Sequence, residues 1–187
     1  MARFEVEVKA PIDDPEAVIA QLEELGAEPE GIVEEEDIYF AHPVRDFAAT
    51  DEAVRVRRQQ DRVFLTYKGP KVDDRTKTRR EIELPLAGSE AWERAIAFLE
   101  AQGYRRVRPV RKERRKFSLS WDGYPVEASV DIVQALGAFV ELETRADEAS
   151  VDDARQALLR LAAVLGLRRS ERRSYLELLL EREKSKS

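Results

Sequence analysis

The chain has 187 residues, of which 37% are charged, yet its formal net charge is only −6. It contains no cysteine and a single histidine, His42, which excludes disulfides, a thiol nucleophile, cysteine-ligated zinc and any site built from several histidines. The charge balance lacks the basic excess that duplex nucleic acid requires, so we expect no nucleic-acid partner. A metal bound to this chain would be held by carboxylates, which indicates Mg²⁺ or Mn²⁺.

The length fits one sizeable core, and no Gly/Ser-rich linker divides the chain. We therefore expect a single domain over residues 1–182 and a frayed tail over residues 183–187. Charged residues follow Met1 closely, without the apolar core of a secretory signal, and no run of about 18 apolar residues is present to cross a bilayer. These features predict a soluble, cytoplasmic protein without a membrane partner. We expect it to act as a monomer or a homodimer.

Residues 4–9, Phe-Glu-Val-Glu-Val-Lys, alternate apolar and charged side chains, which is typical of a β-strand with two opposite faces. Its polar face carries Glu5, Glu7 and Lys9. Carboxylates two positions apart on one strand face are separated by about 7 Å, close enough to share a divalent cation. An ordinary strand with a solvated polar face would show the same alternation. The interpretation therefore depends on the rest of the chain.

Further strands are predicted where alternating or apolar runs lie between turn residues. They cover residues 32–40, 53–59, 62–68, 80–84, 106–119, 124–133 and 138–144. Residues 42–51 and 69–78 are predicted as polar loops, the second of which begins with a turn at Gly69 and Pro70. Both are long for hairpin connections.

Helices are predicted from capping residues and apolar stripes. Asp13 or Asp14 caps the first helix, which begins at Pro15 and ends at Gly26. The others are a helix capped by Ser89, one running from Ser150 to Gly166, and a final helical turn or two at residues 175–180.

The chain also contains signs of an internal repeat. Glu81 and Glu83 reproduce the alternation of Glu5 and Glu7 after 76 positions, and apolar residues of the second helix follow those of the first after 77. Each half would consist of a strand, a helix and three further strands. We therefore predict an α+β fold with about eight mainly antiparallel strands and with helices outside the sheet.

Charged side chains recur at alternate positions on nearly every predicted strand. On one face, the acids are Glu5, Glu7, Glu81, Glu83, Glu127, Asp131, Glu141 and Glu143, and the bases are Lys9, Arg55, Arg57, Lys68, Arg79, Lys112, Arg114 and Lys116. If the sheet closes into a barrel, this face lines a polar tunnel, where the charges must pair or hold a ligand. Arginine and lysine suit polyphosphate oxygens, and carboxylates suit a bridging divalent ion. An open sheet with a solvated charged face is the alternative.

The sequence Glu5-Val-Glu7-Val-Lys9 resembles the ExExK signature of the CYTH superfamily, the triphosphate tunnel metalloenzymes, which include class IV adenylyl cyclases and thiamine triphosphatases. The likeness continues in order along nearly the whole chain. It includes Asp37-Ile-Tyr-Phe40, Arg55-Val-Arg57, Thr66-Tyr-Lys68-Gly-Pro70, Arg80-Glu-Ile-Glu83, Lys112-Glu-Arg114, Asp131 with Leu136-Gly137, Phe139-Val-Glu141-Leu-Glu143 and Ser174-Tyr-Leu-Glu-Leu178. Residues 37–51 and 66–70 look most like the class IV cyclase branch of bacteria and archaea.

This resemblance implies a closed eight-stranded tunnel and a set of site residues. The metal ligands would be Glu5, Glu7, Glu141 and Glu143, and these four with Lys9 would form the catalytic set. The substrate-binding residues would be Lys9, Arg55, Arg57, Lys68, Lys112 and Arg114, with Glu83 and Asp131 as further tunnel acids. Arg79, Lys116 and Glu127, which face inward by alternation alone, are interpreted as structural ion-pair members.

We favour a metal-dependent enzyme that acts on a triphosphate, with class IV adenylyl cyclase-like conversion of ATP to cyclic AMP and pyrophosphate as the preferred reaction. The alternatives are a triphosphatase, acting on inorganic triphosphate or on an organic one such as thiamine triphosphate, and a non-enzymatic triphosphate sensor. Because loop 69–78 mixes charges of both signs, we expect it to be mobile in the free protein and to order over bound triphosphate and metal.

Overall fold

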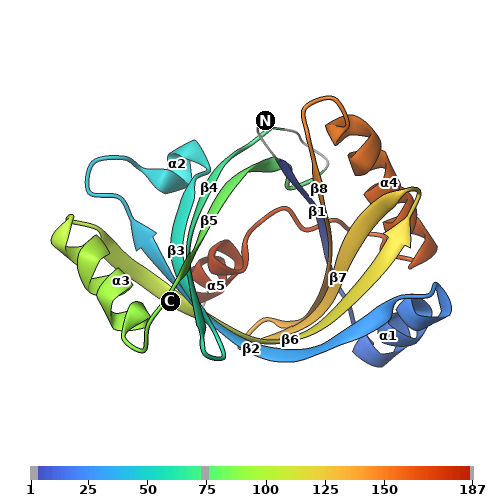
Figure 1. Cartoon of the computed structure of the whole chain (residues 1–187), viewed down its shortest axis with the longest axis horizontal. Helices are drawn as coiled ribbons and strands as arrows, with labels where there is room; N and C mark the ends of the chain where they lie inside the picture. The colour runs from blue at the N-terminus through green and yellow to red at the C-terminus, as the bar shows by residue number, and fades with distance from the viewer. Residues whose placement is uncertain (1–3, 73–75, 186–187) are drawn as a thin grey trace.

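The computed structural model describes residues 4–72 and 76–185 of the chain. These residues form a closed barrel whose strands follow one another in the order β1-β5-β4-β3-β2-β6-β7-β8 (Figure 1). All neighbouring strands are antiparallel. Their bounds are Phe4–Pro11 (β1), Glu28–Ala41 (β2), Ala53–Gln59 (β3), Arg62–Lys71 (β4), Arg79–Leu86 (β5), Arg105–Trp121 (β6), Tyr124–Val133 (β7) and Gly137–Ala146 (β8). The predicted α+β fold with a closed eight-stranded barrel is confirmed.

The barrel also shows the predicted repeat of a strand, a helix and three further strands. The first half contains β1, β2, β3 and β4, and the second contains β5, β6, β7 and β8. β1, the first strand of the first half, pairs with β8, the last strand of the second half. In the same way β5, the first strand of the second half, pairs with β4, the last strand of the first half. With the pairings of β1 with β5 and of β2 with β6, four pairings in all join the two halves into one ring. At the β1–β5 junction the register covers only two residue pairs, Phe4 with Arg80 and Glu5 with Arg79.

The helices are α1 (Pro15–Glu24), α2 (Phe47–Thr50), α3 (Ala91–Ala101), α4 (Val151–Val164) and α5 (Tyr175–Lys184). The outer faces of β1, β6, β7 and β8 bury an apolar core with α1 and α4, in which Val6, Leu22 and Leu158 are fully buried. A second core lies between α2, α3 and the outer faces of β2, β3 and β4. Within the described ranges, no helix is long and apolar enough to span a membrane.

Helix α5 differs from the others because it packs on the inward side of the barrel wall. Tyr175 and Leu179 contact a cluster formed by Val110, Val133 and Phe139, which share strand faces with the charged tunnel residues. Figure 1 shows α5 next to the opening of the ring. The sequence predicted only a turn or two at residues 175–180, and α5 instead extends to Lys184, into the segment for which a frayed tail is predicted.

Two predicted helix caps differ in the structure. The second helix, α3, has Glu90 rather than Ser89 at its N-cap and has no side-chain cap hydrogen bond. Ser150 does occupy the N-cap position of α4, but its Oγ donates to Asp147 Oδ1 at 2.7 Å instead of accepting from the helix. By contrast, Asp14 caps α1 as predicted by accepting from the Ala17 N–H at 3.1 Å.

In their described residues, both predicted loops contain regular secondary structure. Residues 42–51 contain α2, which Asp46 caps through the N–H of Ala48 at 3.0 Å. Gly69 and Pro70 do not turn but continue β4, because the β4–β5 register shifts between Lys68 and Lys71 and so accommodates a proline without an N–H. Residues 73–75, in the middle of the second predicted loop, lie outside the described residues. Residues 76–78, at the end of this predicted loop, are buried. The ordering of the loop over bound triphosphate and metal stays a prediction.

Candidate active site in the barrel

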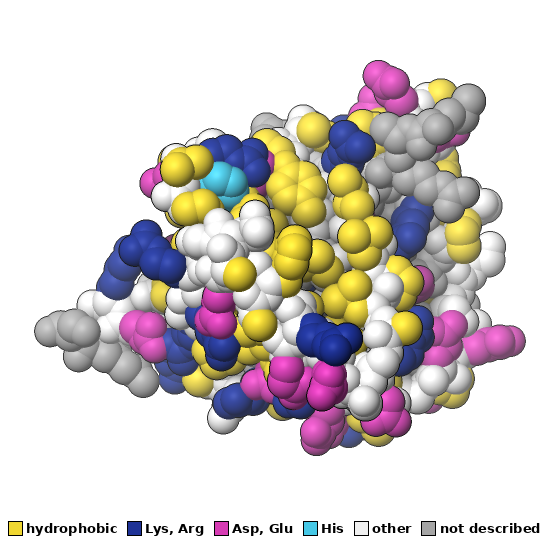
Figure 2. Space-filling view, turned by 60° about the vertical axis from the view of Figure 1, so that its left-hand side comes forward, with side chains coloured by type: hydrophobic (Ala, Val, Ile, Leu, Met, Phe, Trp, Pro, Cys, Tyr) yellow, Lys and Arg dark blue, Asp and Glu magenta, His cyan; other side chains and the backbone are white. Residues whose placement is uncertain are grey.

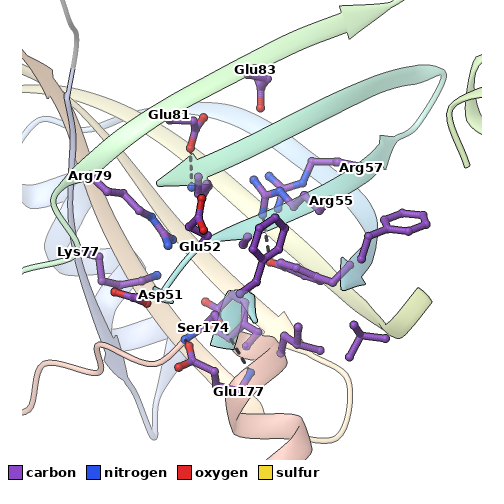
Figure 3. Close-up of a pocket in the computed structure, with 18 of the residues that line it drawn as sticks. Asp51, Glu52, Arg55, Arg57, Lys77, Arg79, Glu81, Glu83, Ser174 and Glu177 are labelled. Carbon is purple, nitrogen blue, oxygen red and sulfur yellow. Dashed lines mark hydrogen bonds and ion pairs between the residues drawn. The ribbon is translucent and has the colours of Figure 1, made fainter. Parts of the chain in front are cut away.

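The inward faces of the strands line a cavity of about 700 Å³, into which side chains point from several strands (Figure 3). Of the predicted site residues it is lined by Glu5, Glu7, Lys9, Arg55, Arg57, Lys68, Glu83, Lys112, Arg114, Glu141 and Glu143. The inward direction inferred for Arg79, Glu81, Lys116 and Glu127 is also confirmed. The alternation of charged residues therefore reflects a barrel interior and not an open, solvated sheet face.

Asp131 is the predicted site residue that does not line the cavity. It is fully buried and accepts hydrogen bonds from Lys112 Nζ at 2.9 Å, Arg114 Nε at 2.7 Å and the Tyr175 hydroxyl at 2.9 Å. These contacts orient two cavity-lining bases and tie α5 to the barrel wall. In this geometry Asp131 is a residue that positions Lys112 and Arg114.

The predicted metal ligands lie on neighbouring strands β1 and β8. Glu7 is directly opposite Glu143 in the antiparallel register, and Lys9 is opposite Glu141. Glu5 accepts from Lys68 Nζ at 2.7 Å and Glu7 from Lys77 Nζ at 2.5 Å. In the described part of the chain, no group of three histidine, aspartate or glutamate side chains lies close enough together to hold a metal ion.

The donor set nevertheless fits a divalent cation. Four carboxylates on two adjacent strands are hard oxygen ligands of the kind that Mg²⁺ and Mn²⁺ prefer. Burial, followed by the charge of Glu5, raises the pKa of the Glu143 carboxyl to about 8. Burial and the nearby carboxylates thus disfavour the ionised form of Glu143, which a bound cation would favour. A cation bound here would be held by carboxylates of Glu5, Glu7, Glu141 and Glu143 after their side chains rearranged.

The basic wall of the cavity is held by a chain of alternating charges across β3, β2, β6 and β7. Asp37 accepts from Arg57 Nε at 2.7 Å and from an Arg55 guanidinium nitrogen at 3.1 Å. Glu35 lies 3.1 Å from Arg57 and 3.3 Å from Lys112. Burial alone would raise the pKa of Glu35, but the charges of Arg57 and Lys112 outweigh it and hold that pKa well below its ordinary value. The carboxylates therefore stay ionised and fix the bases in place.

Lys9, predicted to bind phosphate, is fully buried and engaged with the segment that precedes α5. Its Nζ donates to the Arg173 carbonyl at 2.5 Å and lies 4.1 Å from the centre of the Tyr175 ring. The Glu171 N–H donates in turn to the Lys9 carbonyl at 2.6 Å. Burial, and next the charge of Lys77, lower the pKa of Lys9 to about 7. Lys9 thus connects the C-terminal segment to the centre of the site.

The charged residues that the sequence did not identify include Glu35, Asp37 and Lys77, which contact predicted site residues. Glu35 and Asp37 belong to four consecutive acids, residues 34–37, which hide the alternation of inner and outer faces on β2. The alignment of Asp37 with Arg57 across β2 and β3 is the signal that could have identified it. Lys77 lies in a predicted loop without periodicity, and the sequence carries no signal for its inward position.

Apolar side chains also line part of the cavity. They include Val44, which precedes α2, Val107 of β6, and Leu176 and Leu180 of α5. Figure 3 shows Ser174, the N-cap of α5, and Glu177 of α5 across the pocket from Glu81 and Glu83. Figure 2 shows His42, the one cyan side chain, with apolar side chains around it. His42 shapes this segment, since its Nδ1 accepts from the N–H groups of Val44 at 3.1 Å and Arg45 at 3.0 Å.

Comparison with known proteins gives consistent results. Residues 3–175 match the CYTH domain family. "Putative adenylate cyclase MJ0240" of Methanocaldococcus jannaschii is 38% identical over 178 residues, which cover 94% of this chain and 98% of that protein. The structure of the PH1819 protein from Pyrococcus horikoshii is 38% identical and superposes with a TM-score of 0.85, covering 95% of this chain and 99% of that one.

A more distant structure shares the fold. It is a Hippeastrum protein described as a "putative adenylyl cyclase" with a dominant triphosphatase activity, 15% identical, with a TM-score of 0.61 and 96% of each chain covered. The match of the family over most of the sequence, the 38% identity to two archaeal proteins and the charged barrel interior agree with one another. The chain belongs to the CYTH domain family.

Proposed function

We propose that this protein is a metal-dependent enzyme that binds a triphosphate in the barrel cavity and converts ATP to cyclic AMP and pyrophosphate. The observation that carries the proposal is the division of one cavity into two chemical sides. Carboxylates gather on β1 and β8, and paired guanidinium and ammonium groups gather on β3 and β6. A polyanion with a divalent cation requires both sides at once.

The bases are built to bind phosphate oxygens with little reorganisation. Asp37 fixes Arg57 through two hydrogen bonds, of 2.7 and 2.8 Å, and Asp131 holds Lys112 and Arg114. A buried, pre-oriented guanidinium stabilises charge on a leaving phosphate more effectively than a solvated one. Bound by Glu5, Glu7, Glu141 and Glu143, Mg²⁺ or Mn²⁺ would supply charge neutralisation and a lowered pKa for the attacking hydroxyl.

In the proposed reaction, the ribose 3′ oxygen forms a bond to the α-phosphorus while the bond from that phosphorus to the bridging oxygen of pyrophosphate breaks. The proton of the 3′ hydroxyl leaves to solvent, and the bases offset the charge that develops on pyrophosphate. The triphosphatase alternative uses the same residues but has water attack the terminal phosphorus. The apolar residues that line part of the cavity, among them Val44 and Leu176, favour a triphosphate with an organic group over the inorganic one.

Product analysis tests the proposal. The protein is incubated with ATP and, separately, with inorganic triphosphate, each in Mg²⁺ and in Mn²⁺, and the products are separated by chromatography. Cyclic AMP with equimolar pyrophosphate is the expected result. ADP with orthophosphate from ATP would refute the cyclase reaction in favour of a triphosphatase. Tight binding of ATP without turnover in either metal would indicate a sensor.

A further inference from the structure

Lys77 is a buried, charged residue at the centre of the site that neither the sequence analysis nor the proposed reaction uses. It lies two positions before β5, and its backbone N–H donates to the Glu7 carbonyl at 2.9 Å. Its Nζ lies 2.5 Å from Glu7 Oε1, and the two side chains are only 6% and 5% exposed. The ammonium group of Lys77 therefore forms an ion pair with a carboxylate oxygen of Glu7, a candidate metal ligand.

The surroundings of Lys77 place its ammonium group among the other candidate catalytic residues. The charge of Lys77 is the largest electrostatic contribution that lowers the pKa of Lys9, and it also lowers the pKa of Glu141. Figure 3 shows Lys77 and Arg79 both reaching into the pocket. Lys77 is thus close to Glu7, Lys9 and Glu141 at once, where a divalent cation bound by the carboxylates would also lie.

Lys68, which also pairs with a candidate metal ligand, is held differently from Lys77. Its Nζ is held between two carboxylates, at 2.7 Å from Glu5 and 2.5 Å from Glu81. Lys77 is anchored to β1 by its backbone, so its flexible four-carbon side chain can leave Glu7 without any movement of the strand. Mg²⁺ demands carboxylate oxygens at 2.0–2.1 Å with near-octahedral geometry. It cannot share Glu7 Oε1 with an ammonium group at hydrogen-bond distance without strong repulsion between the two cations.

We propose that Lys77 is a built-in counter-cation of the metal site, which holds Glu7 in the metal-free protein and is displaced when a divalent cation binds. The released ammonium group then becomes available to the phosphate oxygens of the substrate in the same cavity. This inference rests on the carboxylate metal site of the proposed function but not on the reaction that follows binding.

The test compares the Mn²⁺ affinities of wild type, Lys77→Met and a matched control, without nucleotide. The control is Lys71→Met, which removes a lysine from the same region whose Nζ pairs at 2.6 Å with Asp51, outside the candidate metal ligands. Free Mn²⁺ is measured by electron paramagnetic resonance. Because a hydrogen bond to a charged group is worth about 1.5–3 kcal/mol, loss of the competitor should tighten binding by about tenfold or more in Lys77→Met. Lys71→Met should bind as wild type does.

A second variant and a measurement on the wild type test the proposal even if Lys77→Met does not fold. Lys77→Gln keeps a hydrogen-bond donor but no charge, so it should also bind Mn²⁺ more tightly. In the wild type, the lysine ammonium signal in contact with Glu7 should shift in NMR spectra when Mg²⁺ is added. Three results would overturn the proposal. They are a Mn²⁺ affinity of the folded Lys77 variants that is equal to or weaker than that of the wild type, an ammonium signal that does not shift at saturating Mg²⁺, and no Mn²⁺ binding by any of the proteins. Because no nucleotide is present, an absence of cyclase activity would leave these results unaffected.

Discussion

Replacing Asp131 with asparagine should destabilise the protein strongly, although the two side chains have nearly the same shape. Asp131 is fully buried and accepts from Lys112 Nζ, Arg114 Nε and the Tyr175 hydroxyl. Breaking a buried ion pair by removing one partner costs about 3–5 kcal/mol, because the other charge is left without compensation. Lys112 and Arg114 keep second partners in Glu35 and Glu141. We therefore take the lower value, about 3 kcal/mol.

In a domain of this size, each kcal/mol shifts the melting temperature by about 2–4 °C, so Asp131→Asn should lower Tm by about 6–12 °C. Calorimetry or thermal unfolding followed by circular dichroism measures the change. Glu127→Gln is the control, since the Glu127 side chain is 62% exposed and 3.7 Å from Lys116, and exposed pairs contribute about 0–1 kcal/mol. A Tm for Asp131→Asn within 2 °C of the wild-type value would show that Asp131 does not hold the two bases.

Three further changes test other parts of the site. Arg57→Lys keeps the charge but loses the two-pronged contact with Asp37, so KM should rise by about tenfold. Unchanged steady-state kinetics would remove Arg57 from substrate binding. Glu143→Gln should weaken Mn²⁺ binding in a titration by about tenfold or more but leave the Tm of the metal-free protein nearly unchanged, because with a pKa of about 8 this carboxyl is largely protonated at neutral pH. A large fall in that Tm would contradict this assignment. Because the folded state holds the pKa of Glu35 well below 4.5, the unfolded chain takes up a proton first as pH falls, and stability should decrease below about pH 4.5. Glu35→Gln should flatten this decrease in acid denaturation curves, and an unchanged slope would argue against it.

The barrel interior could be predicted from the sequence because strands place alternate residues on opposite faces. Glu5, Arg55 and Glu141 each alternate with apolar neighbours, and these charged faces point inward in the closed barrel. The same rule failed on β2, because its consecutive acids at residues 34–37 mark both faces as charged. Only the pairing of Asp37 with Arg57, a contact between strands, distinguishes the inner acids from the outer ones.

Features that depend on tertiary packing could not be predicted. The apolar residues of α5 show that one side of the helix is buried, but not that it is buried inside the barrel against Phe139. Gly69 and Pro70 have the composition of a turn, and only the register shift between β4 and β5 allows them to continue a strand. Lys77 faces inward because its backbone is bonded to Glu7, a contact between segments 70 positions apart.

The pairing of β1 with β8 has a consequence for the order of folding. β1 makes eight registered pairs with β8 but only two with β5, so the first strand of the chain stays largely unpaired until the last strand has formed. Contacts between such distant segments are slow to form because the entropy of closing a long loop must be lost first. The candidate metal carboxylates are divided between these same two strands. During synthesis, the site therefore assembles only when the ring closes. An ion that binds this site would stabilise the closed barrel and not the partly folded chain.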